Sequence, residues 1–566
     1  MLTRRQVVAG AGAMSAAALT LPGLGKRAIA APRGLTPLQA ARQQATPEAE
    51  LRPSLHSYPL TEEKKTLKIM VPHYGIDWVN NAFTKWYEDR TNVHVEWTVV
   101  EDEAAITQLN LQLASGDYPD IIMGFNWSPF ELTPTVISAY GGEGVFIALN
   151  DYLDEYAPNL NQYVIPEYPI AQKIMTMADG QIYSLPYIND CYHCQYSSQK
   201  LWVQTQWLDA LGLEAPTTID EFEAMLEAFK TGDPNGNGKA DEVPLTAFPD
   251  WPLEGYMMSP FQITPKKPWL YNDGGKVTAA YMQEGWAQGA AYLQGLTSKG
   301  LLSPEIFTQN SDQIRALGNN NQIGAAPGVV QGVFMTTSEG TPGLWSDFHI
   351  MAPVAGPSGK RQVFRDFDES HLGNVFVITD KCPDPALAVA WADGLYAWDA
   401  TIRSIFGVPD VDWRAAEDGE LGVDGEPARY AKIPQPANET GEDQHQSWAQ
   451  LSPSFRNAKD RLSEAAIGDR EANTEVLLYE GCHDQLEPYA TGEDVDLLRP
   501  IFTADEATRV SDLETVIVDF VREQLALQVT GQADPNDRDP FLEQLKSLGI
   551  DEYLELQQTA YDRVSG

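Results

Sequence analysis

The sequence predicts an α/β fold with a mostly parallel sheet, organised in two lobes. Residues 66–71 and 120–124 are compact apolar runs, and residues 93–100 alternate like a strand with one buried face. Strands separated by helices favour parallel pairing through right-handed crossovers. A chain of 566 residues, 43% of them apolar, can bury a large core and is too long for one ordinary domain. We therefore expect at least two lobes.

The elements between and after these strands are predicted to be helical. Residues 79–88 and 104–114 connect the first three strands. Further on, Thr218 with Glu221 forms a capping box that begins another helix. Residues 406–445 are rich in glycine, proline and acidic residues, and we expect them to form a long surface excursion.

The composition excludes some classes of partner. The formal net charge is −41 and the isoelectric point is near 4.4, whereas nucleic acids and anionic membranes require a basic surface. We therefore expect no nucleic-acid partner. Four cysteines are few for this length, so disulfides cannot be the main source of stability.

The first thirty residues have the pattern of an export signal. Arg4 and Arg5 precede an uncharged run that reaches Gly25, and residues 28–30 form a small-x-small cleavage pattern. The arginine pair resembles a twin-arginine signal, and an ordinary secretory leader is the alternative. No cysteine follows the apolar run, so we expect a periplasmic or extracellular protein without a lipid anchor. Residues 31–65 are polar and proline-punctuated, and are predicted to be a linker.

A calcium-binding loop is predicted at residues 233–242, because oxygen-bearing side chains recur there at alternate positions. Gly238 stands where an EF-hand loop has its glycine, and Pro244 stands where such a loop has its bidentate glutamate. Glu242 is the expected substitute. A polar turn without an ion is the alternative. The candidate ligands, which include the Lys239 carbonyl, are Asp233, Asn235, Asn237, Lys239, Asp241 and Glu242.

Several short sequence segments resemble those of one protein family. Residues 216–222 and 233–245 look like the calcium-loop region of extracellular solute-binding proteins of carbohydrate ABC transporters, in the LplA-like branch that includes alginate- and aldouronate-oligosaccharide-binding proteins. Residues 111–122, 148–160 and 200–213 resemble further phrases of that family. The segment 200–213 departs from the family pattern, because Gln204 and Gln206 replace the usual Arg-x-Asp. The resemblance implies a structural calcium ion on the six residues named above.

The resemblance also implies an architecture. We expect the two-lobed periplasmic-binding-protein fold of class II type, with a hinge and an interlobe cleft. The first lobe would comprise residues 66–187 and 368–405. The second would comprise residues 188–367 and 406–566 and would carry the calcium loop.

Candidate ligand-binding residues follow from the predicted sheet. In open parallel sheets the crevice lies beyond the carboxyl ends of the strands, and sugar recognition needs aromatic faces beside planar polar groups. Trp127 directly follows a predicted strand, and relatives place a stacking tryptophan near Trp269. A core or interdomain position is the alternative for Trp127. The full set is His73, Tyr74, Asn126, Trp127, Tyr187, Asp190, Tyr192, Trp269 and Asp368.

The pair Cys191 and Cys194 allows three interpretations. Zinc would need a second ligand pair, and a thioredoxin-type dithiol would need a different βαβ context. A disulfide is the plainest interpretation for an exported chain, either within the pair or with Cys382 or Cys482.

We predict an exported, monomeric substrate-binding protein, not an enzyme, that closes on an oligosaccharide and presents it to ABC-transporter permease subunits. The alternative is a secreted glycosidase or lyase with a structural calcium, using carboxylates in residues 365–369. A peptide or metal-chelate binder is a third interpretation. Alginate-like polyanions have a precedent in the family. Removing the leader's four positive charges takes the net charge from −41 to −45, so a polyanion would need a locally basic cleft, and neutral or mildly acidic saccharides are an equal expectation.

Overall fold

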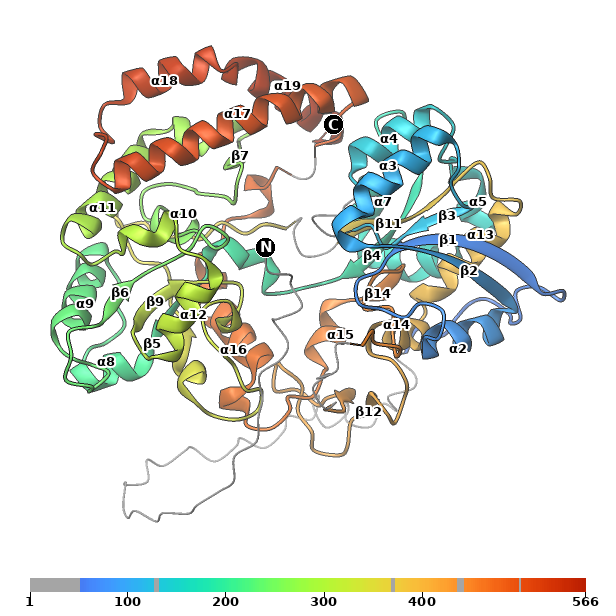
Figure 1. Cartoon of the computed structure of the whole chain (residues 1–566), viewed down its shortest axis with the longest axis horizontal. Helices are drawn as coiled ribbons and strands as arrows, with labels where there is room; N and C mark the ends of the chain where they lie inside the picture. Colours follow the sequence, from blue (N-terminus) through green and yellow to red (C-terminus); the bar gives the residue numbers. More distant parts are fainter. Residues whose placement is uncertain (1–50, 127–131, 368–371, 435–441, 498–499, 566) are drawn as a thin grey trace.

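Two sheets form the centres of two lobes, at the right and left of Figure 1. The computed structural model describes residues 51–126, 132–367, 372–434, 442–497 and 500–565. The predicted leader and residues 31–50 of the predicted linker lie outside these ranges. Within the described residues, no helix is long and apolar enough to cross a membrane.

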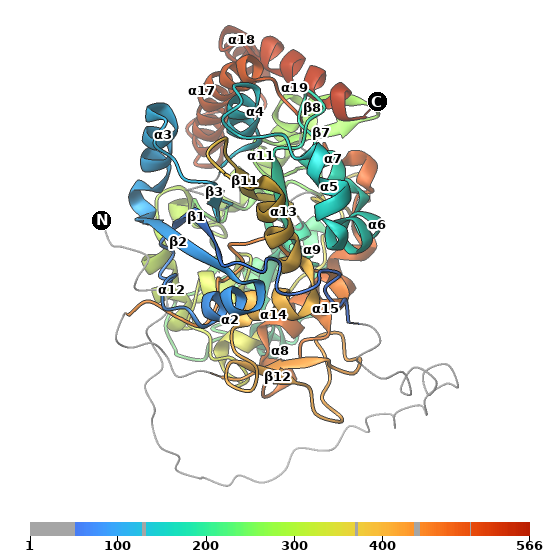
Figure 2. The ribbon, with the colours of Figure 1, turned by 90° about the vertical axis from the view of Figure 1, so that its right-hand side faces the viewer.

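The first lobe is built on a six-stranded sheet in the order β14-β4-β11-β3-β1-β2. β1 pairs in parallel with β2 and β3, β14 pairs in parallel with β4, and β11 is antiparallel to β3 and β4. Figure 2 brings this lobe to the front, with helices around its sheet. The strands are β1 (Lys65–Pro72), β2 (Val93–Val100), β3 (Ile121–Met123), β4 (Ser184–Asn189), β11 (Leu372–Ile378) and β14 (Ser454–Arg456). The main helices are α2 (Ala82–Thr91), α3 (Ala105–Ser115), α4 (Pro134–Gly142), α5 (Asn150–Tyr156), α7 (Pro169–Met175), α13 (Pro385–Asp393) and α14 (Trp398–Phe406).

The second lobe is built on a four-stranded sheet in the order β10-β5-β9-β6. Three C-terminal helices lie together over this lobe in Figure 1, where α17 contacts α11 and α19 and also reaches α4 of the first lobe. The strands are β5 (Leu201–Gln204), β6 (Val243–Leu245), β9 (Ile323–Pro327) and β10 (Phe348–Ile350). The main helices are α8 (Thr205–Leu211), α9 (Ile219–Thr231), α11 (Glu284–Ser298), α12 (Ser311–Asn319), α16 (Thr474–Glu480), α17 (Ala504–Val529), α18 (Arg538–Ser547) and α19 (Ile550–Ser565).

The helix before the predicted calcium loop shows how the local sequence forms these elements. At the start of α9 the Thr218 hydroxyl accepts a hydrogen bond from the backbone N–H of Glu221 at 3.2 Å. This contact satisfies one of the N–H groups that a helix start leaves without an intrahelical partner. The buried side of α9 presents Phe222, Leu226 and Phe229 to the core of the second lobe.

Residues 51–64 are not a free tether. The guanidinium of Arg52 lies 2.6 Å from the Asp460 carboxylate and 4.3 Å from the ring centroid of Phe455. The His56 ring nitrogen Nε2 lies 2.8 Å from the buried Asp393 carboxylate. The linker prediction was therefore wrong for this stretch, because Arg52 and His56 find partners on the first lobe.

The predicted lobe boundary was wrong between residue 406 and the start of α16. β14 completes the sheet of the first lobe, and Trp448 is fully buried in the core of that lobe. Its ring makes an edge contact with Phe83 at 4.6 Å, and its indole N–H donates to the Thr84 hydroxyl at 2.8 Å. The predicted surface excursion carries a short hairpin of β12 (Trp413–Ala415) and β13 (Tyr430–Lys432).

In the part that the structure describes, the chain crosses between the lobes at three places. After β4 it continues through a short helix, η5 (Cys194–Gln199), into β5. It returns through residues 363–367 toward β11, and it crosses again between α15 (Ala458–Leu462) and α16. The side chains of these crossing segments are therefore placed where the lobes meet.

Replacing Trp448 by alanine tests the revised boundary. Loss of this buried indole should lower the free energy of unfolding by about 3–5 kcal/mol, measured by urea denaturation. Val411→Ala, at a side chain that is 55% exposed in the neighbouring excursion, should change it by less than about 0.5 kcal/mol. Equal changes in the free energy of unfolding for the two substitutions would contradict the placement of Trp448 in the first-lobe core.

Candidate functional site

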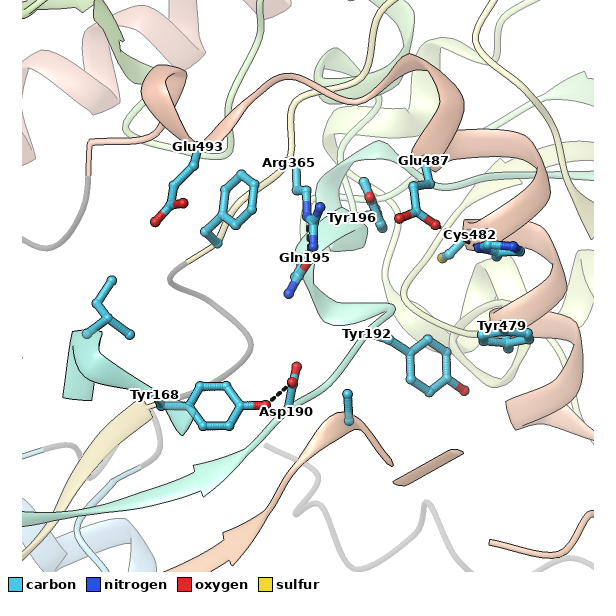
Figure 3. Close-up of a pocket in the computed structure, with 14 residues that line it drawn as sticks. Tyr168, Asp190, Tyr192, Gln195, Tyr196, Arg365, Tyr479, Cys482, Glu487 and Glu493 are labelled. Carbon is cyan, nitrogen blue, oxygen red and sulfur yellow. Dashed lines mark hydrogen bonds and ion pairs between the residues drawn. The ribbon is translucent and has the colours of Figure 1, made fainter. Parts of the chain in front are cut away.

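A cavity of about 330 Å³ lies between the lobes, at the crossing segments (Figure 3). Its first-lobe side includes Tyr168, which lies just before α7, and Ala458 at the start of α15. Its second-lobe side comes from α16 and from the π-helical turn η12 (Gly481–Leu486) that continues it. The complete lining is Tyr168, Ile170, Asp190, Tyr192, Gln195, Tyr196, Arg365, Phe367, Ala458, Tyr479, Cys482, His483, Glu487 and Glu493.

Aromatic rings dominate one wall of this cleft. The Tyr479 and His483 rings are stacked with centroids 5.4 Å apart, because residues four apart share one side of a helix. Tyr192 meets Tyr479 edge-to-face at 5.5 Å. On the floor, the Arg365 guanidinium lies 4.3 Å above the ring of Phe367. The cleft therefore offers flat apolar faces bordered by polar groups.

The polar groups in the cleft are held in fixed orientations. Tyr168 donates a short hydrogen bond to the Asp190 carboxylate, as the dashed line in Figure 3 shows. Burial and the neighbouring carboxylate raise the pKa of Tyr168, so its hydroxyl remains a donor. Arg365 donates from Nε to the Gln195 side-chain oxygen at 2.5 Å. His483 Nδ1 lies 2.7 Å from a Glu487 carboxylate oxygen.

A polar network behind the cleft links the crossing segments. The Tyr192 hydroxyl donates to the Glu475 carboxylate at 2.8 Å, and the Arg461 guanidinium reaches the same carboxylate at 3.3 Å. Desolvation acts to raise the pKa of Glu475, but Arg461 and other nearby groups bring that pKa well below its ordinary value. Burial and the adjacent Lys200 lower the pKa of His193. Glu475 is therefore ionised and His193 neutral at neutral pH.

A disulfide joins Cys191 to Cys194, with Cα atoms 5.3 Å apart. It encloses Tyr192, which lines the cleft. With His193, these cysteines form the one group of three or more His, Cys, Asp or Glu side chains in the described part of the chain that could hold a metal ion, with ligand atoms within 4.8 Å of one another. Both sulfurs are in the disulfide, so the group does not fit zinc. Cys382 and Cys482 are buried thiols, and burial raises the pKa of each to about 11.

Two of the predicted ligand-binding residues, Asp190 and Tyr192, line the cleft. Tyr187 lies earlier on β4, with its ring against Gly373. Trp269 is 1% exposed and packs in the second-lobe core. Trp127 and Asp368 lie outside the described residues.

Three more predicted residues follow β1 and β3, as expected for strand ends. His73 Nε2 lies 2.7 Å from the Asp443 carboxylate, Tyr74 is 43% exposed, and Asn126 is buried. They do not line the cavity between the lobes.

Most of the cleft lining was not predicted. No local sequence signal separates four of these residues from core residues, namely Tyr168, Gln195, Tyr196 and Phe367. Tyr479, His483 and Glu487 recur at intervals of four residues. That spacing on a helix could have indicated a shared face.

Some of the candidate ligands in the predicted calcium loop contact one another. Asp241 Oδ1 accepts hydrogen bonds from the amides of Asn237 at 2.9 Å and Asn235 at 3.5 Å. The Asp233 carboxylate accepts from the backbone N–H of Gly238 at 3.1 Å. Glu242 has a buried carboxylate oxygen without a hydrogen-bond partner. These oxygen donors and the unsatisfied carboxylate are of the type that a hard divalent cation prefers, but Asp233, Asp241 and Glu242 do not form a close group of ligand atoms in the described part of the chain.

Residues 74–399 match the family described as bacterial extracellular solute-binding proteins. The chain belongs to this family. Its relatives include the fructooligosaccharide ABC transporter substrate-binding protein FusA of Streptococcus pneumoniae serotype 4. FusA is 27% identical over 519 residues, which cover 90% of this chain and 92% of FusA.

Solved structures support the fold. FusA in complex with kestose aligns with a TM-score of 0.69 at 24% identity, covering 88% of this chain and 99% of FusA. An HMO-binding solute-binding protein from Bifidobacterium longum infantis aligns at 0.73 and 22% identity, with coverages of 88% and 99%. Alginate-binding protein AlgQ2, solved without calcium ion, aligns at 0.64 and 24% identity, with coverages of 90% and 100%. The two-lobed solute-binding-protein fold is confirmed.

Membership of this family also decides between a substrate-binding protein and a glycosidase or lyase, because members of the family bind solutes for transport and do not transform them. The protein is a solute-binding protein and not an enzyme. Of the carboxylates proposed for the enzyme alternative, Asp366 is buried in an ion pair with Lys266 at 2.9 Å. Asp368 and Glu369 lie outside the described residues.

The disulfide can be tested by counting thiols. The unfolded, unreduced mature protein should expose two titratable thiols of its four cysteines, and reduction should expose four. Replacing Cys191 and Cys194 together by serine should lower the free energy of unfolding by about 2 kcal/mol, because a four-residue loop is no longer closed in the unfolded chain. Four thiols before reduction would contradict the pairing.

Proposed function

We propose that this protein captures a neutral oligosaccharide in the cleft between its lobes and presents it to the permease of an ABC importer. The observation that carries the proposal is the cleft itself, with aromatic faces and fixed polar groups contributed by both lobes. FusA, which is similar over most of both chains, is named as a fructooligosaccharide ABC transporter substrate-binding protein. Both walls of the cleft belong to one chain, which supports a monomer.

The geometry supports binding by closure of the lobes. Asp190 is fixed to the first lobe by its backbone N–H, which donates to the Arg456 carbonyl at 2.9 Å, and by the Tyr168 hydroxyl. Tyr479 belongs to the second lobe. A sugar that stacks on the ring of Tyr479 and donates a hydroxyl hydrogen bond to Asp190 contacts both lobes at once. It therefore stabilises the closed arrangement over the open one.

The charge of the cleft supports a neutral ligand. Three carboxylates, Asp190, Glu487 and Glu493, face the cavity against one guanidinium, that of Arg365. Arg365 is already engaged by Gln195 and by the Phe367 ring. A polyuronate would bring further negative charge to this surface, and juxtaposed like charges oppose binding. Hydroxyl groups, by contrast, donate well to carboxylates.

We further propose that the loop at residues 233–242 binds a structural calcium ion. The ion would be held by the side chains of Asp233, Asn235, Asn237, Asp241 and Glu242 and by the Lys239 carbonyl. The loop lies between α9 and β6, away from the crossing segments (Figure 1), so the ion would stabilise the second lobe and take no part in sugar binding. The Asn235 amide also donates to the Asn321 carbonyl at 3.1 Å, which ties the loop to the segment before β9.

The extracellular family supports export, and we propose that the leader with Arg4 and Arg5 directs it by the twin-arginine route. The mature protein would carry no lipid anchor, because no cysteine follows the apolar run of the leader.

Calorimetric titration tests the proposed ligand class. Kestose, nystose and maltotriose form the neutral panel, and trigalacturonate is the acidic probe. At least one neutral sugar should bind tenfold or more tightly than trigalacturonate. Tyr479→Ala should weaken that binding by about 1–3 kcal/mol, because an aromatic anchor is lost. Tyr118→Ala, at a first-lobe tyrosine that does not line the cleft, should leave the affinity unchanged. Preference for the uronate, or an unaffected Tyr479→Ala variant, would contradict the proposal.

Chelation tests the proposed calcium ion. At a calcium concentration one hundred times Kd, removing the ion should lower the free energy of unfolding by about 2.7 kcal/mol and lower Tm. Asp233→Ala should behave like the chelated protein, whereas Asp209→Ala on the exposed side of α8 should not. Sugar affinity should stay nearly constant in all of these samples. A Tm that changes neither with chelator nor in the Asp233→Ala variant would contradict the proposed calcium ion.

A further inference from the structure

A second and larger cavity, of about 840 Å³, lies in the second lobe, and none of its lining residues lines the cleft between the lobes. We call it the lobe-2 cavity. Its walls come from the end of η5, from residues 247–255, 265–269 and 306–307, from α11, from the end of β9, and from α17. The volume falls within the range of about 300–1,000 Å³ that is usual for small-molecule sites.

The floor of the lobe-2 cavity is apolar and rigid. Leu253, Leu293, Ile306 and Phe307 contribute aliphatic and aromatic surface. Four prolines also contribute, namely Pro249, Pro252, Pro265 and Pro327. Because proline fixes its own backbone φ angle, a ligand has little wall to order when it binds.

Trp251 gives the cavity an accessible aromatic face. A tight turn, in which the Trp251 backbone N–H donates to the Phe248 carbonyl at 2.9 Å, sets the position of the indole. The side chain is only half-buried, unlike that of Trp269, which also lines the cavity but is 1% exposed. A half-exposed indole that lines the cavity together with aliphatic side chains suits the C–H face of a sugar ring.

Charges of both signs line the cavity. Lys267 and Arg522 stand with four carboxylates, and Lys266 is ion-paired at 2.9 Å with Asp366, which lies outside the lining. Glu254 is half-buried near Arg522, and the other carboxylates are Asp250, Asp519 and Glu523. Such a mixture suits a neutral ligand that both donates and accepts hydrogen bonds. It disfavours a polyanion, which would meet four carboxylates, and a lipid chain, which would leave the charges unpaired.

We propose that the lobe-2 cavity is a second binding site for neutral saccharides, with Trp251 as its stacking face and Glu254 and Arg522 as its polar contacts. The choice of saccharide rests on the proposed function of the protein. The geometry differs between the two sites, because every wall of the lobe-2 cavity belongs to one lobe. Binding there requires no closure, so a ligand gains no contact from the first lobe and this site is the weaker one.

Calorimetry with kestose and with maltotriose, carried to millimolar concentration, tests this site. The wild-type isotherm of at least one sugar should need two sites. Trp251→Ala should weaken the second site tenfold or more and leave the tighter site unchanged. Tyr479→Ala should do the reverse. Arg522→Gln, at an exposed position on α17 where folding is not at risk, should also weaken the second site alone.

A second measurement locates the weak binding. In protein labelled with 5-fluorotryptophan, the ¹⁹F resonance that disappears in Trp251→Phe belongs to Trp251. It should shift at the sugar concentrations that fill the second site. An isotherm with one site, or a Trp251 resonance that does not move at saturation, overturns the second site while the cleft proposal stands. A wild-type isotherm that lacks only the tighter site overturns the cleft proposal. The absence of any sugar binding overturns both proposals.

Discussion

The parallel pairing of β14 with β4 is the constraint on which the cleft depends. Ser454, Phe455 and Arg456 pair with Tyr187, Ile188 and Asn189, and the Arg456 carbonyl then accepts the backbone N–H of Asp190. Both strands leave the sheet at the same end. One delivers Asp190 and the disulfide-closed loop with Tyr192, and the other delivers Ala458 and α15. A shift by one residue would turn every side chain of β14 to the opposite face of the sheet.

From this edge the chain connects to the opposite lobe through polar contacts. Arg461, on α15, lies 3.4 Å from the Asn189 side-chain oxygen and 3.3 Å from Glu475 on α16. The same Glu475 carboxylate accepts the Tyr192 hydroxyl. These contacts place the ring of Tyr192 against Tyr479 before any ligand arrives. A preformed wall lowers the entropy that binding must overcome, and this favours recognition by closure of largely rigid lobes.

The sequence predicted best what depends on local spacing. The alternation of strands and helices indicated the first sheet. The spacing of the Asx-rich loop brings Asn235 and Asn237 into contact with Asp241, and the calcium ion stays a prediction. Asp190 and Tyr192 could be predicted because they follow a strand at an interlobe crossing. Tyr479 and His483 could not be assigned to the cleft, because their segment meets Tyr192 only through the tertiary fold. β14 escaped detection because it has three residues in a polar stretch, although its pairing decides the lobe boundary. Trp269 lies in an aromatic, proline-rich loop, and such loops look alike in sequence whether the indole is buried or accessible.

Small-angle X-ray scattering of the mature protein tests most directly whether the two lobes close on a neutral oligosaccharide. The radius of gyration should fall when a sugar fills the interlobe cleft, and it should stay at the ligand-free value in Tyr479→Ala at the same sugar concentration. A radius of gyration that is identical with and without a sugar bound in the cleft would contradict capture by lobe closure.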